Sequence, residues 1–172
     1  MKTGPRHAIG NGGRLMVNVR RSVPADLPGL MRVERESFPT PWSEESVLSF
    51  QNDPEHRLCY TATDDREAEV VGYLALQYVD DEAELCNIAV LPARRGGGIG
   101  ALLIDTAVDF CSRKSIRLLH LEVRENNAPA IALYRRKGFC PVGIRRGYYA
   151  DSGEDAFLFS RIIEHESPSD TG

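Results

Sequence analysis

The sequence predicts a mixed α/β fold: a central sheet of about seven strands, antiparallel except for one parallel pair, with about four helices. The main observation lies in the middle of the chain. A strand over residues 84–90 is followed by a glycine-rich turn, a helix from about 98 to 114, and a second strand over 116–123. This order is typical of a right-handed crossover between parallel strands. The second observation is a set of short strands on both sides of this unit, separated by polar turns. They are expected over residues 17–23, 58–63, 70–79, 142–146 and 156–163.

The remaining elements follow from local signals. A first helix is expected after Pro24, and Ser43 is a good cap for a second. Asn126 or Asn127 caps the last helix, which should stop at Gly138, where glycine can adopt the left-handed conformation.

Length and composition limit the organisation of the chain. Its 172 residues suffice for one domain, expected over residues 16–165, with a disordered glycine-rich leader over 1–15 and a loose tail over 166–172. Met16 is an alternative start of translation to Met1. The net charge of -4 gives no reason to expect general nucleic-acid or membrane binding. No apolar run approaches the ~20 residues that span a bilayer. We expect a cytoplasmic protein that is a monomer or weak homodimer.

The four cysteines show no metal-binding or disulfide spacing. They lack a C-x-x-C pair, and two of them fall in apolar patterns, so buried free thiols and no metal site are expected. They are Cys59, Cys86, Cys111 and Cys140.

The glycine-rich turn is the strongest functional signal. The strand ends at Pro92, and Gly96, Gly97, Gly98 and Gly100 come just before the helix. Amide N–H groups that converge there, together with the helix N-terminus, form a site for an anion such as phosphate. The neighbouring Arg94 and Arg95 are expected to reinforce it. A Walker A loop is excluded because no Gly-Lys-Ser/Thr follows, whereas a dinucleotide fingerprint (G-x-G-x-x-A) stays an alternative.

Two stretches carry a family resemblance. Arg95-x-x-Gly98-x-Gly100, after a strand that contains Asn-Ile-Ala-Val, resembles the acyl-CoA loop of the GNAT superfamily of N-acyltransferases. Residues 121–139, Leu-Glu-Val-Arg-Glu-Asn-Asn through Ala-Leu-Tyr to Gly-Phe, are similar to RimI-type ribosomal-protein alanine acetyltransferases. The resemblance covers about residues 17–163. Gly97 departs from it, because the family usually has a longer and often basic residue there.

This resemblance implies acetyl-CoA as co-substrate and assigns roles to residues. Glu122 matches the family's general base and Tyr134 its general acid, and Asn127 matches a residue that contacts CoA. The strand edge can hydrogen-bond the pantetheine arm as an added strand would, and the loop amides with Arg95 hold the pyrophosphate. The expected cofactor-binding residues are Ile88, Ala89, Val90, Arg95, Gly96, Gly97, Gly98, Ile99, Gly100, Ala101 and Asn127.

Two aromatic segments are candidates for the walls of a peptide-binding groove. The first contains Phe38 and Trp42 in a proline-stiffened connection, and the second contains Tyr148 and Tyr149. An ordinary packed loop would explain the first segment equally well, and a hairpin end with exposed aromatic residues is the alternative for the second. His120 is a second candidate base on the same strand face as Glu122.

The function predicted is transfer of acetyl from acetyl-CoA to the N-terminal α-amine of a protein, by direct attack in a ternary complex. Whether the base acts directly or through a water stays open. The alternatives are a small-molecule amine or lysine acetyltransferase, a non-catalytic acyl-CoA-binding regulator, and, more distantly, a nicotinamide-dependent dehydrogenase.

Overall fold

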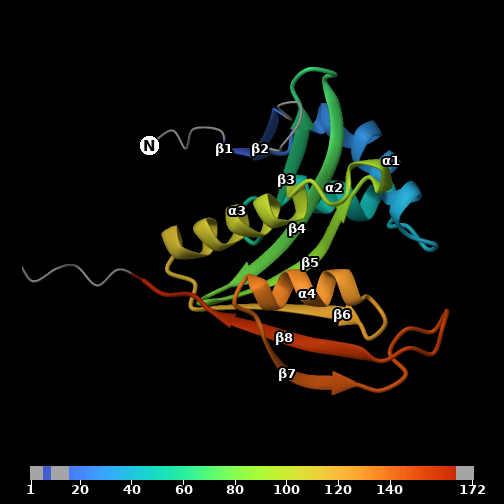
Figure 1. The fold of residues 1–172 in the computed structure, drawn as a ribbon. Coiled ribbons are helices and arrows are strands. Elements are labelled where there is room, and N and C mark those ends of the chain that lie inside the picture. The colour runs from blue at the N-terminus through green and yellow to red at the C-terminus, as the bar shows by residue number, and fades with distance from the viewer. Residues whose placement is uncertain (1–5, 9–15, 166–172) are drawn as a thin grey trace, which may run out of the picture.

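The computed structural model describes residues 6–8 and 16–165, whose strands form one sheet (Figure 1). The strand order is β1-β2-β3-β4-β5-β6-β8-β7. Only β5 and β6 run parallel, and all other neighbours are antiparallel. The predicted mixed sheet is confirmed, with one more strand than expected because β1 (Arg6–Ala8) pairs with β2 (Val17–Arg21). The rest of the expected leader and the tail lie outside the described residues.

The elements fall close to their expected positions. The other strands are β3 (Arg57–Asp64), β4 (Glu69–Val79), β5 (Glu82–Val90), β6 (Leu118–Arg124), β7 (Cys140–Arg145) and β8 (Ala156–Ile162). The helices are α1 (Leu27–Ser37), α2 (Glu44–Asn52), α3 (Ile99–Arg113) and α4 (Ala128–Arg136), with short 3-10 turns η1 (Pro24–Asp26) and η2 (Pro92–Arg94).

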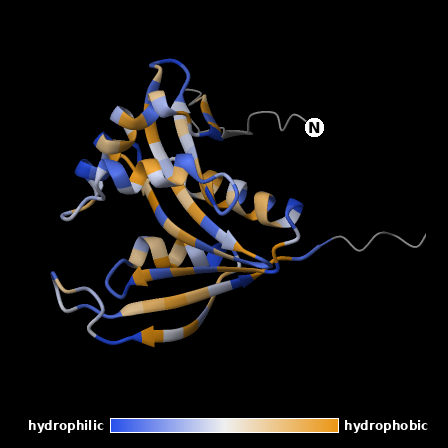
Figure 2. Cartoon of the chain, turned by 180° about the vertical axis from the view of Figure 1, so that it is seen from behind, coloured by the Kyte–Doolittle hydropathy of each residue, from blue (hydrophilic) through white to orange (hydrophobic). Residues whose placement is uncertain are grey.

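The helices lie on both faces of the sheet, α1 and α2 behind it and α3 and α4 in front of it in the view of Figure 1. Neighbouring residues of β4 show this arrangement. Tyr73 reaches Glu34 of α1, whereas a Cβ on Gly72 would approach Ile99 of α3. Apolar residues concentrate on the central strands and on the inner helix faces (Figure 2), so one continuous core lies on the two sides of the sheet.

Capping residues fix where the helices begin and end. Ser43 accepts a hydrogen bond from the amide of Ser46 at 3.1 Å, and Asn127 accepts one from the amide of Ala130 at 3.3 Å. Gly138 follows α4 with φ of +82°, a conformation in which a side chain is strained. The sequence predicted all three helix boundaries, and the structure confirms them.

The pairing between β5 and β6 stops halfway. Its register runs from Glu82 opposite Leu118 to Leu85 opposite Leu121 and no further. Beyond that point β5 pairs only with β4, and β6 pairs only with β8. A bulge in the β4–β5 ladder lies next to this point, between Ala75 and Leu76. The two parallel strands therefore separate toward their carboxyl ends and leave a gap with free backbone edges (Figure 1).

Candidate active site

The glycine loop lies at the carboxyl end of β5, on the same end of the sheet as Asn127, which follows β6. Gly96 and Gly98 have φ of +82° and +86°, and Gly98 is the N-cap of α3. No atom lies within 4 Å of a Cβ built on either residue. The loop therefore exposes backbone amides at a helix N-terminus beside the gap, which is the arrangement that binds phosphate oxygens.

Arg95 is exposed and lies at this loop. Its Nε donates to the carbonyl oxygen of Val90 at 3.0 Å, so the side chain also ties the loop to the end of β5. Its predicted contact with a pyrophosphate stays a prediction.

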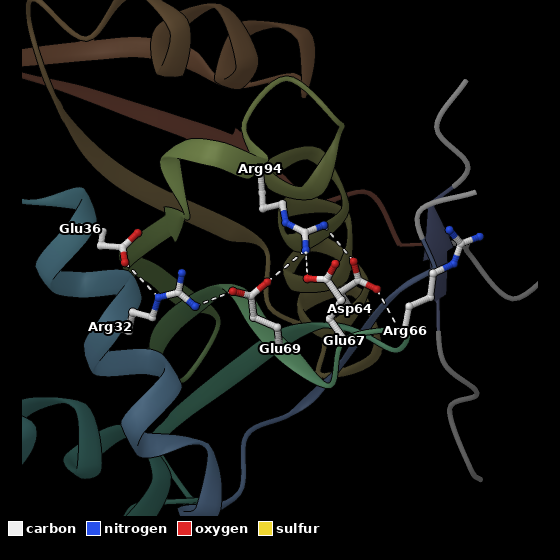
Figure 3. A network of polar contacts seen from close by, with 7 residues as sticks. All are labelled: Arg32, Glu36, Asp64, Arg66, Glu67, Glu69 and Arg94. Atoms are coloured by element: carbon white, nitrogen blue, oxygen red, sulfur yellow. Dashed lines mark hydrogen bonds and ion pairs between the residues drawn. The ribbon is translucent and has the colours of Figure 1, made fainter. Parts of the chain in front are cut away.

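Arg94 does not reinforce the anion site, and this expectation was wrong. Its guanidinium contacts Asp64 and Glu67 at 2.8 Å each and Glu69 at 3.0 Å (Figure 3). These carboxylates raise the pKa of Arg94, chiefly through the hydrogen bond that Arg94 donates to Asp64. The three acidic residues come from the β3–β4 hairpin, which lies far from Arg94 in the sequence. The position of Arg94 next to the glycines therefore did not predict these partners.

Glu122 lies on β6 one residue beyond the last pairing with β5, on the strand face opposite α3 and α4. The side chain retains 22% exposure and contacts the Nε of Arg145 at 3.2 Å. Its hydrogen bond with the phenol of Tyr148 is the largest cause of the raised pKa of Tyr148. The carboxylate is therefore accessible, held from two sides, and located at the opening between the strands.

A groove of about 870 Å³ extends from Glu122 along this face of the sheet. Carboxylates outnumber the arginines that line it, six to two, so it favours a positively charged occupant. The lining contains no residue of the glycine loop, which belongs to the side of α3. An amine could approach Glu122 from the groove while an acyl donor occupies the gap.

His120 is less well placed than Glu122 for a role as base. It pairs in register with Glu84, within the closed part of the strand pair. Its Nδ1 lies 2.6 Å from the hydroxyl of Ser160, and its Nε2 lies 3.5 Å from Glu82. Both ring nitrogens thus have partners away from the gap.

Tyr134 of α4 lies on the other face, buried against Phe139 with ring centroids 5.8 Å apart. Burial raises its pKa, so the phenol keeps its proton at neutral pH and is able to donate it. The charge of Tyr149 also raises this pKa, and Glu122 in turn raises that of Tyr149. Glu122 and Tyr134 thus lie on opposite faces of the sheet.

The two aromatic segments have different surroundings. Tyr148 and Tyr149 meet edge to face at 5.2 Å, and Tyr148 reaches Glu122. Trp42 stacks on Phe50 at 5.3 Å, and Phe38 packs against the core, both only partly buried. The structure thus brings the tyrosines to the predicted base, whereas Phe38 and Trp42 do not line the groove beside it.

Arg124 organises the loop that carries the tyrosines, and the sequence analysis missed it. Its guanidinium contacts Asp151 at 2.9 Å and Glu154 at 3.1 Å and lies 3.9 Å from the ring centroid of Tyr149. The acid-rich segment after the tyrosines was a usable signal, because a nearby strand-end arginine is its natural partner.

Cysteine chemistry does not fit this site. Cys86 borders the gap, but burial raises its pKa to about 12, so the nucleophilic thiolate is scarce at neutral pH. Among the described residues no cluster of histidine, cysteine and acidic side chains could hold a metal ion, and no helix of that part is long and apolar enough to cross a membrane.

An amide-lined loop at one end of a strand gap, with an accessible carboxylate on one face of the sheet and a buried phenol on the other, fits an N-acyltransferase that uses a phosphate-bearing acyl donor. Residues 27–139 match the acetyltransferase (GNAT) family, and the chain belongs to this family. It is an N-acetyltransferase.

Several of its relatives are ribosomal-protein alanine N-acetyltransferases. It is 37% identical over 140 residues to the [ribosomal protein bS18]-alanine N-acetyltransferase of Escherichia coli K12, a match that covers 80% of this chain and 92% of that protein. The crystal structure of the E. coli ribosomal-protein-S18-alanine N-acetyltransferase is similar with a TM-score of 0.80 and 34% identity, over 90% of this chain and 98% of that one. The crystal structure of Ard1 from Thermoplasma volcanium is similar with a TM-score of 0.78 and 26% sequence identity, over 87% of this chain and 99% of that one.

Proposed function

We propose that this protein transfers acetyl from acetyl-CoA to the N-terminal α-amine of a protein, with a ribosomal protein that begins with alanine as the first candidate acceptor. The observation that carries the proposal is the position of Glu122, accessible from an acidic groove and located where the parallel strands separate. The similarity to bS18-alanine N-acetyltransferases supports the choice of acceptor. Such an acceptor would place the reaction in the cytoplasm.

Acetyl-CoA would occupy the gap between β5 and β6. Its pyrophosphate would accept hydrogen bonds from the amides of residues 96–101, with Arg95 alongside, and Asn127 would contact CoA from the other strand end. The pantetheine arm would pair with the free edge of β5 at residues 88–90, as an added strand does. The same edge offers backbone N–H groups that can stabilise the negative charge on the carbonyl oxygen during attack.

The chemistry would proceed through direct attack. Glu122 removes a proton from the acceptor ammonium, directly or through a water, and the free amine attacks the thioester carbon. The C–S bond then breaks, Tyr134 donates its proton to the leaving thiolate, and the proton that the attacking nitrogen loses goes to solvent, from which the phenol is reprotonated. Burial raises the pKa of Tyr134, so the phenol is protonated at neutral pH.

An α-amine suits this site better than a lysine side chain does. An α-amine titrates near ~8 and a lysine near ~10.4. Deprotonation of lysine at neutral pH therefore costs about 3 kcal/mol more, at ~1.4 kcal/mol per pH unit. Glu122 is a single carboxylate that already contacts Arg145 and Tyr148, so it can offset the deprotonation cost of an α-amine more easily than that of a lysine.

The test is turnover with a panel of acceptors. We expect peptides with a free N-terminus, alanine first among them, to be acetylated far faster than their N-terminally blocked lysine-containing counterparts or small amines. Glu122→Gln should lower kcat by about 10²–10⁴-fold without a loss of acetyl-CoA affinity. Glu125→Gln is the matched control, because it makes the same change three residues later, where the side chain only accepts from the amide of Asp155.

The possible results separate the alternatives. Faster acetylation of lysine side chains or of small amines would replace the proposed acceptor. Binding of acetyl-CoA with no turnover on any acceptor would favour a non-catalytic regulator. A Glu122→Gln variant as active as the Glu125→Gln control would remove Glu122 from the mechanism.

A further inference from the structure

A buried carboxylate in α1 has no part in the chemistry described above. Glu34 is 0% exposed, and its oxygens accept hydrogen bonds from three groups. These are the backbone amide of Trp42 at 2.7 Å, the side-chain amide of Asn87 at 2.8 Å and the hydroxyl of Tyr73. Within residues 16–165, no arginine, lysine or histidine forms an ion pair with it.

A carboxylate in this position is expensive. Burial of a charge without an ionic partner costs several kcal/mol unless hydrogen bonds to the charged form compensate. Three donors provide that compensation here. The hydroxyl of Tyr73 also accepts from Asn87 at 2.8 Å, so the three side chains form a closed polar cluster inside an apolar core. An apolar residue would fill the same space without this cost, so the cluster calls for a role that packing does not supply.

The donors belong to two segments with different predicted roles, the aromatic connection as a wall for the acceptor peptide and β5 as the edge for the acetyl donor. Trp42 closes the aromatic connection between α1 and α2. Asn87 lies on β5 two residues beyond Leu85, the last residue paired with β6, and directly precedes the edge at residues 88–90. One carboxylate thus accepts hydrogen bonds from the predicted acceptor wall and from the donor-side strand at once.

We propose that Glu34 is a positioning residue that fixes the loop around Trp42 relative to the free edge of β5, and thereby places the acceptor amine at the thioester. The inference rests on the proposed function of the gap as the acetyl-CoA site. Tyr73 of β4 stabilises the arrangement, because its hydroxyl donates a hydrogen bond to Glu34 and accepts one from Asn87.

Glu34→Gln tests this role. The neutral amide keeps one acceptor oxygen and presents an N–H₂ group to neighbours that are themselves donors, so at least one of the bonds to Trp42 or Asn87 is lost. We expect kcat/KM for the acceptor peptide to fall about tenfold or more, as for the loss of a charge-assisted hydrogen bond. The Kd of acetyl-CoA should change less than about threefold, because the glycine loop is untouched.

A second readout is independent of catalysis. Trp42 is the single tryptophan of the chain, so its fluorescence reports on this loop alone. Acrylamide should quench it more efficiently in Glu34→Gln than in the wild type, at temperatures well below unfolding.

Asp26→Asn is the matched control. Asp26 is also a buried carboxylate, 7% exposed, and it accepts hydrogen bonds from Arg20 at 2.7 and 2.8 Å and from Val23 at 2.8 Å. Its partners belong to the region around η1 and not to the loop or the gap. Asp26→Asn should therefore lower the Tm but leave acceptor kinetics and Trp42 quenching unchanged.

Asn87→Ala serves if Glu34→Gln does not fold. It removes the donor on the strand side and leaves the bond between Glu34 and Trp42, and it should lower acceptor kcat/KM in the same way. The inference is overturned if the folded variants keep wild-type acceptor kinetics, or if Asp26→Asn changes kinetics and quenching as much as they do. A wild-type protein that acetylates no peptide N-terminus would instead refute the proposed function, and the quenching comparison would still decide whether Glu34 holds the loop.

Discussion

Gly98→Ala is the sharpest test of the glycine loop. Gly98 has φ of +86° and begins α3, and a Cβ at this position would meet no atom within 4 Å. The penalty of a side chain is therefore one of backbone conformation and not of collision. A residue other than glycine in the left-handed region costs about 1–2 kcal/mol.

The strain energy at residue 98 can weaken acetyl-CoA binding or lower the stability of the fold, so both quantities must be measured. If the free loop relaxes out of the left-handed conformation, acetyl-CoA must restore it, and the Kd rises about 5–30-fold for 1–2 kcal/mol. If the loop stays as it is, the strain lowers the free energy of unfolding by the same amount. We expect the losses measured by calorimetric titration and by urea unfolding to add up to about 1–2 kcal/mol.

Gly97→Ala is the control within the same loop. Gly97 lies between two left-handed glycines but is not left-handed itself, so alanine there should be neutral or should stabilise the fold by about 0.4–1 kcal/mol. A Gly98→Ala variant that binds acetyl-CoA and unfolds as the wild type does would refute the reasoning. The backbone at Gly98 would then be unconstrained, and the pyrophosphate would have to be bound elsewhere.

Four further predictions concern the site and the cysteines. Tyr134→Phe should lower kcat by about 10²-fold or more with little change in Tm, and the wild type should show no loss of kcat from this group below pH 9, because burial raises its pKa. Trp42→Ala should raise the peptide KM at constant acetyl-CoA affinity; an unchanged KM would mean that its stacking on Phe50 is only packing. A thiol reagent at pH 8 should label exposed Cys140 alone in the native protein, with acetyl transfer retained. The three other thiols have pKa values raised by burial to about 12, so the native state holds protons that the unfolded state releases above about pH 9, and stability should fall as pH rises from there. They are Cys59, Cys86 and Cys111.

Arg94 and Arg95 show where sequence adjacency fails. Both arginines precede the glycines, and the sequence predicted that both would bind an anion at the loop. Arg94 instead forms ion pairs with the acidic residues of the β3–β4 hairpin, whereas Arg95 is exposed beside the glycine loop. The sequence held no signal that separated them, because the partners of Arg94 are 25 to 30 residues away and reach it only through the sheet.

Glu122 shows the opposite case. Strand alternation alone placed it on the face opposite Leu121 and Val123, and the burial of those two residues confirms this. Its partner Arg145 ends β7 and its partner Tyr148 lies in the loop between β7 and β8, so only the folded sheet could identify them.

The sequence by itself determined the elements whose signals are local. Glycine before a helix, asparagine and serine at helix starts, and two strands joined by a helix depend on neighbours within a few residues, and all were predictable. Only the tertiary structure decided where β5 leaves β6, which groups contact Glu122, and which groups Glu34 bonds. Hydrogen bonds and burial at these places join residues that lie tens of positions apart, and one chain's sequence carries no record of which distant partners will meet.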